Sequence, residues 1–276
     1  MRVQVNGIGL NVEVWGEGPP VVLLHGFTGR ATNWRPIAER WPRLRAVAVD
    51  ITGHGDSDSP ASVERYTAPA FCADLAALLD ALGIERAALA GYSMGGRLAL
   101  QFALGRPERV SALVIESASA GIADAAERAA RVASDEALAE RIEREGIEAF
   151  VDYWQSIPLW ESQKLLPESR RAALRAQRLQ NSPRGLANSL RGMGAGAQDY
   201  VFDRLPGLRL PVLFVAGELD ARYAALARSM AALVPGAEVR IIPGAGHATH
   251  FERPEAFAEA AGEFLTRFLL SEKVEA

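Results

Sequence analysis

One short motif combines a serine with the backbone geometry that makes a serine reactive. The stretch Gly91–Gly95 (GYSMG) lies between an apolar, strand-like run at 87–90 and a helix-like run that begins at Met94. A serine on such a tight strand-to-helix turn has a strained backbone, and the flanking glycines remove the collisions that bulkier residues would cause. Its hydroxyl is exposed at the carboxyl end of the strand, beside a helix N-terminus that favours developing negative charge. The motif therefore predicts that Ser93 is a catalytic residue.

A serine hydroxyl needs a base, and the base needs an acid to orient it. The chain holds four histidines: His25, His54, His247 and His250. His247 follows the last predicted strand and would reach the sheet edge beside Ser93, with His250 as the alternative base. Asp220 follows another predicted strand and is the favoured acid, with Glu218 as its nearest competitor. The sequence thus predicts a triad in the order Ser93, Asp220, His247, the order that a strand-to-helix nucleophile turn produces.

The other two histidines have no clear catalytic place. His25 ends the first buried strand, where a structural role in the loop is the simpler interpretation, and His54 lies in a glycine-rich loop. Developing negative charge on a reacting oxygen would instead be stabilised by backbone N–H groups. The amide of Met94, directly after the serine, and that of Phe27, in the loop after the first buried strand, are the candidates for this oxyanion hole.

The elements that position these residues alternate between strands and helices. An alternating pattern with Asn6-Gly7 in its middle predicts a β-hairpin over residues 2–15. Short apolar runs typical of buried parallel strands follow at 21–24, 46–49, 87–90, 112–115, 211–215 and 238–242. Helix-like segments lie between or after them at 68–82, 94–104, 224–233 and 254–270. This alternation predicts a mostly parallel sheet with helices on both of its faces.

The alternation breaks between residues 117 and 205, where no buried strand is evident. Charged, helix-forming segments occupy 124–145, 147–156, 168–179 and 182–193, and the glycine-rich stretch 191–196 suggests a flexible junction. An all-helical insertion at the carboxyl edge of such a sheet would act as a lid. We therefore expect a core formed by residues 1–118 and 206–276, with a helical cap formed by residues 119–205.

Composition restricts the kinds of function that the chain could have. The 276 residues carry a net charge of −4, which favours neither nucleic acid nor an anionic membrane as a partner. No apolar run is long enough to span a bilayer, and the N-terminus lacks the apolar segment of a signal peptide. Cys72 is the only cysteine, so an internal disulfide and a cysteine-based zinc site are both excluded. We expect a cytoplasmic protein without membrane insertion, metal or other cofactor; its oligomeric state is not predicted.

Five motifs together give the chain a family resemblance that covers nearly everything outside the predicted lid. They are His25-Gly26, Asp50-x-x-Gly53-x-Gly55-x-Ser57, Gly91-x-Ser93-x-Gly95-Gly96, Gly217-x-x-Asp220 and Gly246-His247-x-x-x-x-Glu252-x-Pro254. This set resembles the α/β-hydrolase fold family, which implies an α/β fold with an inserted helical lid and a Ser-His-Asp triad. Haloalkane dehalogenases and epoxide hydrolases of this fold carry an aspartate at the position of Ser93, so the serine argues against both.

Arg97 lies one helical turn after Ser93, and its position bears on which substrates the protein could bind. Its apolar neighbours predict a largely buried helix, where a guanidinium is costly unless it meets an anion. That anion could be an internal carboxylate, such as Asp74 or Glu116, or a carboxylate of the substrate. The sequence alone leaves both open.

Three longer motifs are similar to those of a narrower family. They are Leu24–Gly29 (LHGFTG), Gly91–Arg97 (GYSMGGR) and, within the lid, Leu190–Gln198 (LRGMGAGAQ). Together they resemble the 2-succinyl-6-hydroxy-2,4-cyclohexadiene-1-carboxylate synthases of menaquinone biosynthesis. These lyases eliminate pyruvate from 2-succinyl-5-enolpyruvyl-6-hydroxy-3-cyclohexene-1-carboxylate, a small molecule with three carboxylates.

The resemblance implies roles for several further residues. Arg97, Arg131 and Arg178 would bind substrate carboxylates, and Tyr92 and Trp154 would be aromatic residues of the pocket. Arg128, Arg175 and Arg191 are alternatives for the lid positions, because nearly all of the 30 basic residues are arginine. The implied reaction is proton abstraction by a His-activated Ser93, without water or an acyl-enzyme. A serine hydrolase, acting as an esterase or on a C–C bond, is the main alternative, and a non-catalytic binding protein is the third.

Overall fold

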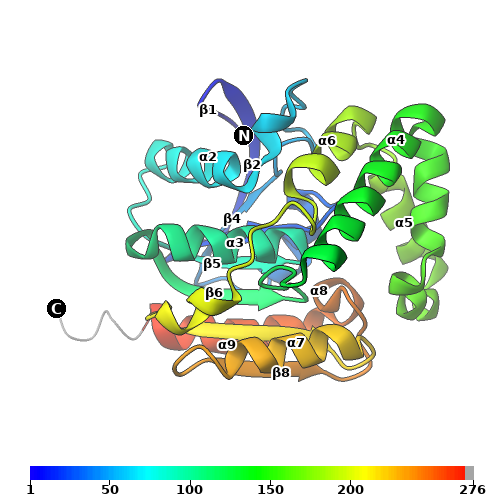
Figure 1. Cartoon of the computed structure of the whole chain (residues 1–276). Helices are drawn as coiled ribbons and strands as arrows, with labels where there is room; N and C mark the ends of the chain where they lie inside the picture. The colour runs from blue at the N-terminus through cyan, green and yellow to red at the C-terminus, as the bar shows by residue number, and fades with distance from the viewer. Residues whose placement is uncertain (271–276) are drawn as a thin grey trace.

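The computed structural model of the protein describes residues 1–270, and these contain one eight-stranded sheet with the strand order β1-β2-β4-β3-β5-β6-β7-β8 (Figure 1). The strands are β1 (Arg2–Val5), β2 (Ile8–Trp15), β3 (Pro20–Leu24), β4 (Arg45–Val49), β5 (Ala87–Tyr92), β6 (Val110–Glu116), β7 (Val212–Gly217) and β8 (Glu238–Ile242). The β1–β2 hairpin is antiparallel, as is the β2–β4 pair, and all other neighbours are parallel. The predicted hairpin and mostly parallel sheet are therefore confirmed.

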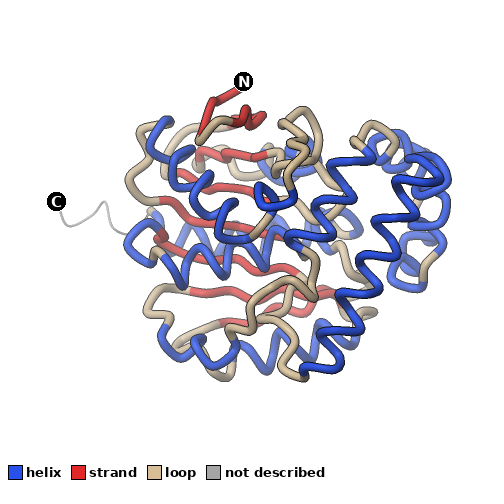
Figure 2. The backbone as a smooth tube through the Cα atoms, turned by 45° about the horizontal axis from the view of Figure 1, so that its top comes forward, coloured by secondary structure: helices blue, strands red, loops and turns tan. Residues whose placement is uncertain are grey.

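Helices cover both faces of the sheet, and the alternation of side chains in the strands explains why (Figure 2). In β3, Val22 and Leu24 belong to the apolar cluster under α2, α3 and α7, whereas Val21 and Leu23 belong to the cluster under α1 and α9. A strand whose side chains are buried on both faces reads as a continuous apolar run. The core helices are α1 (Arg35–Ala38), α2 (Ala68–Ala81), α3 (Met94–Gly105), α7 (Ala221–Ala231), α8 (Thr249–Glu252) and α9 (Pro254–Leu269).

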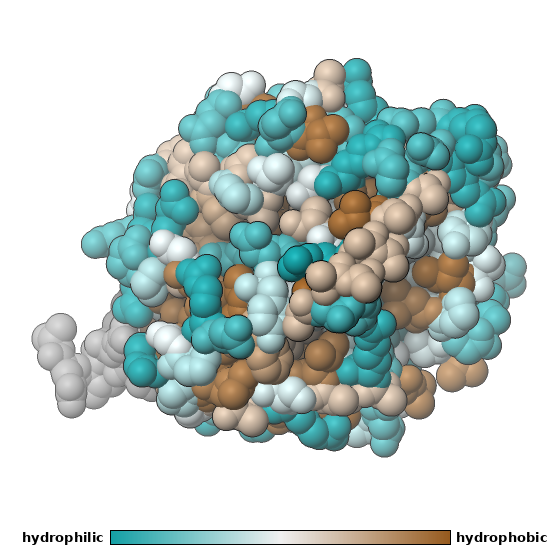
Figure 3. Space-filling view, viewed as in Figure 1, coloured by the Kyte–Doolittle hydropathy of each residue, from teal (hydrophilic) through white to brown (hydrophobic). Residues whose placement is uncertain are grey.

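Three helices and a 3₁₀ segment lie between β6 and β7, away from the sheet. They are α4 (Ala125–Ser156), η4 (Pro158–Leu165), α5 (Glu168–Arg178) and α6 (Pro183–Met193). The two helices predicted at 124–145 and 147–156 are the two parts of α4, which meet at a kink at Gly146, whose φ of 80° and ψ of 176° are not helical. Residues of α4 and α6 form an apolar cluster of their own, and hydrophilic residues cover much of the lid's outer surface in Figure 3.

This organisation supports the cap as a separate unit. We propose residues 119–205 as the cap and residues 1–118 and 206–270 as the core; residues 271–276 of the predicted core lie outside the described residues. The expectation of a flexible junction at 191–196 needs correction, because residues 191–193 complete α6, in which Gly192 and Met193 are buried. A Cβ on Gly192 would lie 2.8 Å from the backbone of Tyr66, so the glycine serves close packing.

The turn at Ser93 depends on two glycines that leave no room for side chains. Ser93 itself has a φ of 50°, a strained value for a residue with a side chain. A Cβ on Gly91 would lie 2.4 Å from the carbonyl oxygen of Gly95, and a Cβ on Gly95 would lie 2.2 Å from that of Leu24. Both contacts are with backbone atoms, which cannot move aside as a flexible side chain would.

We therefore expect Gly95→Ala to destabilise the protein by about 1–3 kcal/mol or more, the usual cost of overpacking. Gly105→Ala is the matched control, because it lies at the end of the same helix and a Cβ there would meet nothing within 4 Å. Chemical denaturation of both variants measures the difference. Equal free energies of unfolding for the two variants would contradict the proposed role of this close contact.

Candidate active site

The structure brings Ser93, Asp220 and His247 together at the carboxyl edge of the sheet. Each residue follows the end of a strand: Ser93 follows β5, Asp220 follows β7 and His247 follows β8. His247 Nε2 is 3.1 Å from Ser93 Oγ, and His247 Nδ1 is 2.7 Å from Asp220 Oδ2. An Nδ1–H that donates to Asp220 leaves Nε2 as the acceptor for the serine hydroxyl, which is the arrangement needed to withdraw its proton.

The two oxygens of Asp220 have different partners. Oδ2 contacts His247, while Oδ1 accepts a hydrogen bond from the backbone N–H of Tyr223 at 3.2 Å in the first turn of α7. The helix therefore holds the carboxylate in place. The competing acid, Glu218, instead accepts a hydrogen bond from Gly244 N at 2.9 Å. Geometry thus favours Asp220.

The other histidines are engaged in structural contacts. His250 contacts the buried Glu116 through Nδ1 at 2.8 Å and stacks on Trp34. His25 Nε2 accepts a hydrogen bond from the backbone N–H of Ile51 at 2.9 Å. Burial lowers the pKa of His25 to about 4 and that of His54 to about 3, so both rings are neutral near pH 7. Of the four histidines, only His247 has both a serine and a carboxylate partner.

The two backbone N–H groups predicted to form the oxyanion hole are free to bind a reacting oxygen. Within residues 1–270, neither the Phe27 N–H nor the Met94 N–H has a hydrogen-bond acceptor. The Phe27 loop passes close to the nucleophile turn, since a Cβ on Gly26 would lie 2.6 Å from the Tyr92 ring and 3.4 Å from Ser93 Cβ. Two donors beside one serine are the arrangement that an oxyanion hole needs.

A cavity between the sheet edge and the lid opens onto Ser93 and His247. It encloses about 700 Å³ of empty space, part of it open to solvent. Among the predicted site residues, Phe27, Tyr92, Ser93, Met94, Arg97, Arg131, Trp154 and His247 line it. Residues from the core and from the cap therefore form one site.

Arg97 has no carboxylate partner among the described residues. Its Nη1 donates to the carbonyl oxygen of Met193 at 3.0 Å and to Gln198 Oε1 at 3.4 Å. The two internal carboxylates suggested by the sequence pair elsewhere, Asp74 with Arg65 and Glu116 with His250. Burial lowers the pKa of Arg97 to about 10, so it keeps its charge near neutral pH. An unneutralised guanidinium beside Ser93 fits the second interpretation, a site for a substrate carboxylate.

The lid arginines differ in position. Arg131 lines the cavity and donates from Nε to Asp135 Oδ1 at 2.9 Å. Arg175 pairs with Asp152, and Arg191 pairs with Glu136 and Glu143 on the lid surface. Arg128 is not among the cavity-lining residues. The structure therefore favours Arg131 over these three alternatives.

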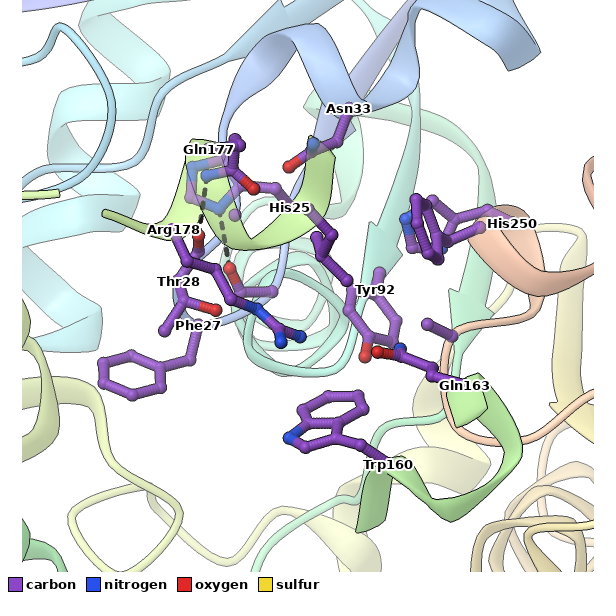
Figure 4. A pocket seen from close by; sticks show the side chains of 15 residues that line it. His25, Phe27, Thr28, Asn33, Tyr92, Trp160, Gln163, Gln177, Arg178 and His250 are labelled. Atoms are coloured by element: carbon purple, nitrogen blue, oxygen red, sulfur yellow. Dashed lines mark hydrogen bonds between the residues drawn. The ribbon is translucent and has the colours of Figure 1, made fainter. Parts of the chain in front are cut away.

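Arg178 lies in an adjoining pocket rather than in the cavity that holds Ser93. Figure 4 shows its guanidinium pointing into this pocket, whose lining includes the Trp160 ring, the Tyr92 ring and Gln163. The guanidinium carbon is 5.1 Å from the centre of the Trp160 ring, and burial lowers the pKa of Arg178 to about 10. Arg178 has no carboxylate partner within residues 1–270. The two cavities share Phe27, Tyr92 and Trp160 in their linings, so an extended ligand could contact both.

Three residues of the site were not predicted from the sequence. Trp160 and Tyr223 contact the His247 ring, with ring centres 5.7 and 4.6 Å away, and Asp135 lines the cavity beside Arg131. Tyr223 follows Asp220 by three residues, so its place in the helix after the acid is a signal that could have found it. Asp135 follows Arg131 by four residues, a spacing that favours an ion pair on a helix.

Fold and site together define an enzyme of the α/β-hydrolase class, and residues 19–254 match the family model described as the alpha/beta hydrolase fold. A Bacillus subtilis protein, provisionally named 2-succinyl-6-hydroxy-2,4-cyclohexadiene-1-carboxylate synthase, is 43% identical over 94% of this chain and 96% of its own length. A Serratia proteamaculans protein with the same name, without the qualification, is 35% identical over 90% of this chain and 94% of its own. The chain therefore belongs to the α/β-hydrolase fold family and, within it, to the 2-succinyl-6-hydroxy-2,4-cyclohexadiene-1-carboxylate synthase family.

Solved structures give the same picture of the fold. MenH from S. aureus superposes with a TM-score of 0.89 at 32% identity, over 93% of this chain and 98% of that one. An esterase from Thermogutta terrifontis, solved with malate bound, has a TM-score of 0.88 at 30% identity, over 98% of this chain and 99% of that one. The nearly equal scores show that backbone similarity alone does not separate a synthase from an esterase. Among residues 1–270, no helix is long and apolar enough to cross a membrane.

Proposed function

We propose that the protein is a lyase of menaquinone biosynthesis that eliminates pyruvate from 2-succinyl-5-enolpyruvyl-6-hydroxy-3-cyclohexene-1-carboxylate. The product is 2-succinyl-6-hydroxy-2,4-cyclohexadiene-1-carboxylate. The observation that carries the proposal is Arg97, a half-buried guanidinium without a carboxylate partner in residues 1–270, which lines the same cavity as Ser93 and His247. The relatives are named as synthases of this product, a ring compound that carries carboxylate groups, which supports a site for an anionic substrate.

The proposed chemistry begins with loss of a proton from ring carbon 2, next to the succinyl ketone. Ser93, activated by His247, takes this proton either directly or as a relay, and Asp220 stabilises the charged imidazole that results. The ketone oxygen of the dienolate gains negative charge, which the N–H groups of Phe27 and Met94 would stabilise. The dienolate then expels enolpyruvate from carbon 5, leaving the conjugated diene.

The protons balance without any added reactant. The enolpyruvate that leaves accepts one proton on its methylene carbon as it becomes pyruvate, while the ring has lost one to the base. Neither water nor a covalent intermediate is consumed or formed. The role proposed for Arg97 and Arg131 is to hold the substrate by carboxylate binding, and Tyr92 and Trp154 would pack against its ring.

Ester or C–C bond hydrolysis is the second candidate, and one observation favours it. Ser93 Oγ already lies within hydrogen-bond distance of His247 Nε2, and a Ser-His-Asp arrangement with two oxyanion donors is also what acyl transfer requires. Lyase and hydrolase differ in what happens at Ser93, because only the hydrolase forms an acyl-enzyme.

We expect the purified protein to release pyruvate from the enolpyruvyl substrate together with a rise in diene absorbance, in equal amounts. Rapid-quench mass spectrometry of the intact protein should show no acyl adduct on Ser93 at any time, because the elimination passes through no covalent intermediate. A coupled lactate dehydrogenase assay measures the pyruvate. An adduct that forms and decays at the turnover rate would support the hydrolase instead.

A further inference from the structure

One carboxylate lines the cavity beside the arginines, and the elimination chemistry does not use it. Asp135 of α4 is only 5% exposed and lines the same cavity as Ser93, Arg97 and Arg131. Its Oδ1 accepts the hydrogen bond from Arg131 Nε at 2.9 Å, while its Oδ2 is buried and lacks a hydrogen-bond partner within residues 1–270. A buried carboxylate is costly without a compensating charge, and Arg131 supplies that charge for Asp135.

The backbone at the end of α6 makes room for this carboxylate. A Cβ on Gly194 would lie 2.5 Å from Asp135 Oδ2, so a side chain at position 194 would collide with it. The preceding residue, Met193, accepts the hydrogen bond from Arg97 through its carbonyl oxygen. Asp135 and Arg97 therefore both lie next to the turn at residues 193–194. The charge of Asp135 acts on Arg97 against the effect of burial and favours the charged guanidinium.

The charges that line the cavity can be counted. Of its lining side chains, Arg97 and Arg131 are positive, Asp135 is negative, and His247 is the other titratable group apart from the two tyrosines. The arginines and Asp135 together leave one positive charge in excess. Two free arginines would suit two carboxylates, but a second carboxylate beside Asp135 would be repelled by it.

We propose that Asp135 is a specificity-determining and positioning residue that limits the cavity beside Ser93 to one substrate carboxylate. Its negative charge offsets part of the positive charge of Arg131. Its Oδ1 also accepts the hydrogen bond from Arg131 Nε, so that only the Nη groups of Arg131 remain free to bind the substrate. This inference rests on the proposed function, since it concerns how a substrate with several carboxylates is divided between sites. Any further carboxylate is then bound outside this cavity.

The test uses two ring compounds that differ by one carboxylate, cyclohexanecarboxylate and cis-cyclohexane-1,2-dicarboxylate. Their binding to the full chain is measured by calorimetry and by quenching of tryptophan fluorescence, because Trp154 and Trp160 line the cavity. Asp135→Asn keeps the size of the side chain and removes its charge. We expect it to increase the affinity for the dicarboxylate, relative to the monocarboxylate, about tenfold. Glu136→Gln is the matched control, because this neighbour does not line the cavity, and the affinity ratio should not change.

A rescue experiment separates this role from a purely structural one. Arg131→Gln leaves Asp135 facing Arg97 alone, so the excess positive charge is lost and binding of the monocarboxylate should weaken about tenfold. Adding Asp135→Asn to that variant restores the charge count and should recover most of the lost affinity. A merely structural Asp135 would make the double variant worse. An unchanged affinity ratio in Asp135→Asn, or a double variant that binds no better than Arg131→Gln, would overturn the proposal.

The outcome does not depend on turnover, so it is distinguishable from failure of the proposed function. If the protein released no pyruvate, the proposed lyase function would be wrong. Binding of the two ring compounds would still show whether the cavity accepts one carboxylate or two. Pyruvate release by Asp135→Asn adds a further readout. Because Asp135→Asn leaves two uncompensated arginines in the cavity, KM for the polycarboxylate substrate should fall, and it should change by a larger factor than kcat.

Discussion

Replacing Ser93 by alanine is expected to lower kcat/KM for pyruvate release by about 10³ or more, with little change in the melting temperature. The hydroxyl is 3.1 Å from His247 Nε2, and it is the group that would move the proton. The turn itself is held by backbone contacts, including the Ser93 N–H bond to the carbonyl oxygen of Glu116 at 2.8 Å, which alanine keeps. Stopped-flow or coupled assays of pyruvate measure the rate, and calorimetry measures the melting temperature.

The partners of Ser93 provide the control for this result. His247→Ala should cause a loss of similar size, and the double variant should be no worse than either single one, because the two residues act as a unit. Ser189→Ala removes a different hydroxyl from the same cavity, one whose contact is with Met94 Sδ at 3.5 Å, and should retain most of the rate. Wild-type turnover by Ser93→Ala would exclude Ser93 as base or relay.

The arrangement of the triad could be predicted from local sequence because each member follows a buried strand. Parallel strands bring their carboxyl ends to one edge, so Ser93, Asp220 and His247 had to lie near one another once the strands were recognised. The sequence favoured Asp220 over Glu218, and in the structure the two residues have different partners. Asp220 is the N-cap residue of α7 and contacts His247, whereas Glu218 accepts a hydrogen bond from the backbone N–H of Gly244.

The lid could be predicted only in outline. Helix-forming segments were evident, but which face of each helix meets the core depends on tertiary packing that no local pattern contains. Arg175 and Arg178 lie about one turn apart on α5, and only the structure shows that Arg175 pairs with Asp152 at the surface while Arg178 is buried under Trp160. Because the chain contains so many arginines, the presence of an arginine at a given position does not by itself identify a binding residue.

Asp135 illustrates a second limit. Its spacing from Arg131 predicts a helix ion pair, which on most helices is a solvent-exposed contact of little consequence. Its burial, and its contact with the turn at Gly194, arise from the packing of α4 against α6, which are far apart in sequence. A sequence pattern can thus predict the ion pair between Arg131 and Asp135, but it cannot predict that the pair lines the cavity beside Ser93.

Replacing Arg97 by alanine is the second change with a large expected effect. A guanidinium that pairs with a substrate carboxylate in a partly desolvated cavity contributes about 2–5 kcal/mol to transition-state or substrate binding. We therefore expect kcat/KM for pyruvate release to fall by about 30-fold to several thousand-fold. Stability should fall only modestly, because no internal carboxylate loses its partner and the bonds lost are those to Met193 and Gln198. Steady-state kinetics and thermal unfolding measure the two quantities.

Arg97→Lys separates charge from geometry and completes the test. Lysine keeps the positive charge but presents a point charge in place of a planar fork, so activity should remain well below wild type while the fold is retained. Arg65→Ala is the structural comparison. It removes the guanidinium whose Nη2 lies 3.0 Å from both carboxylate oxygens of the fully buried Asp74, and should lower the melting temperature far more than Arg97→Ala does. If Arg97→Ala instead lowered the melting temperature as much as Arg65→Ala and left kcat/KM unchanged, Arg97 would be a structural residue and the carboxylate site would have to be sought at Arg131 or Arg178.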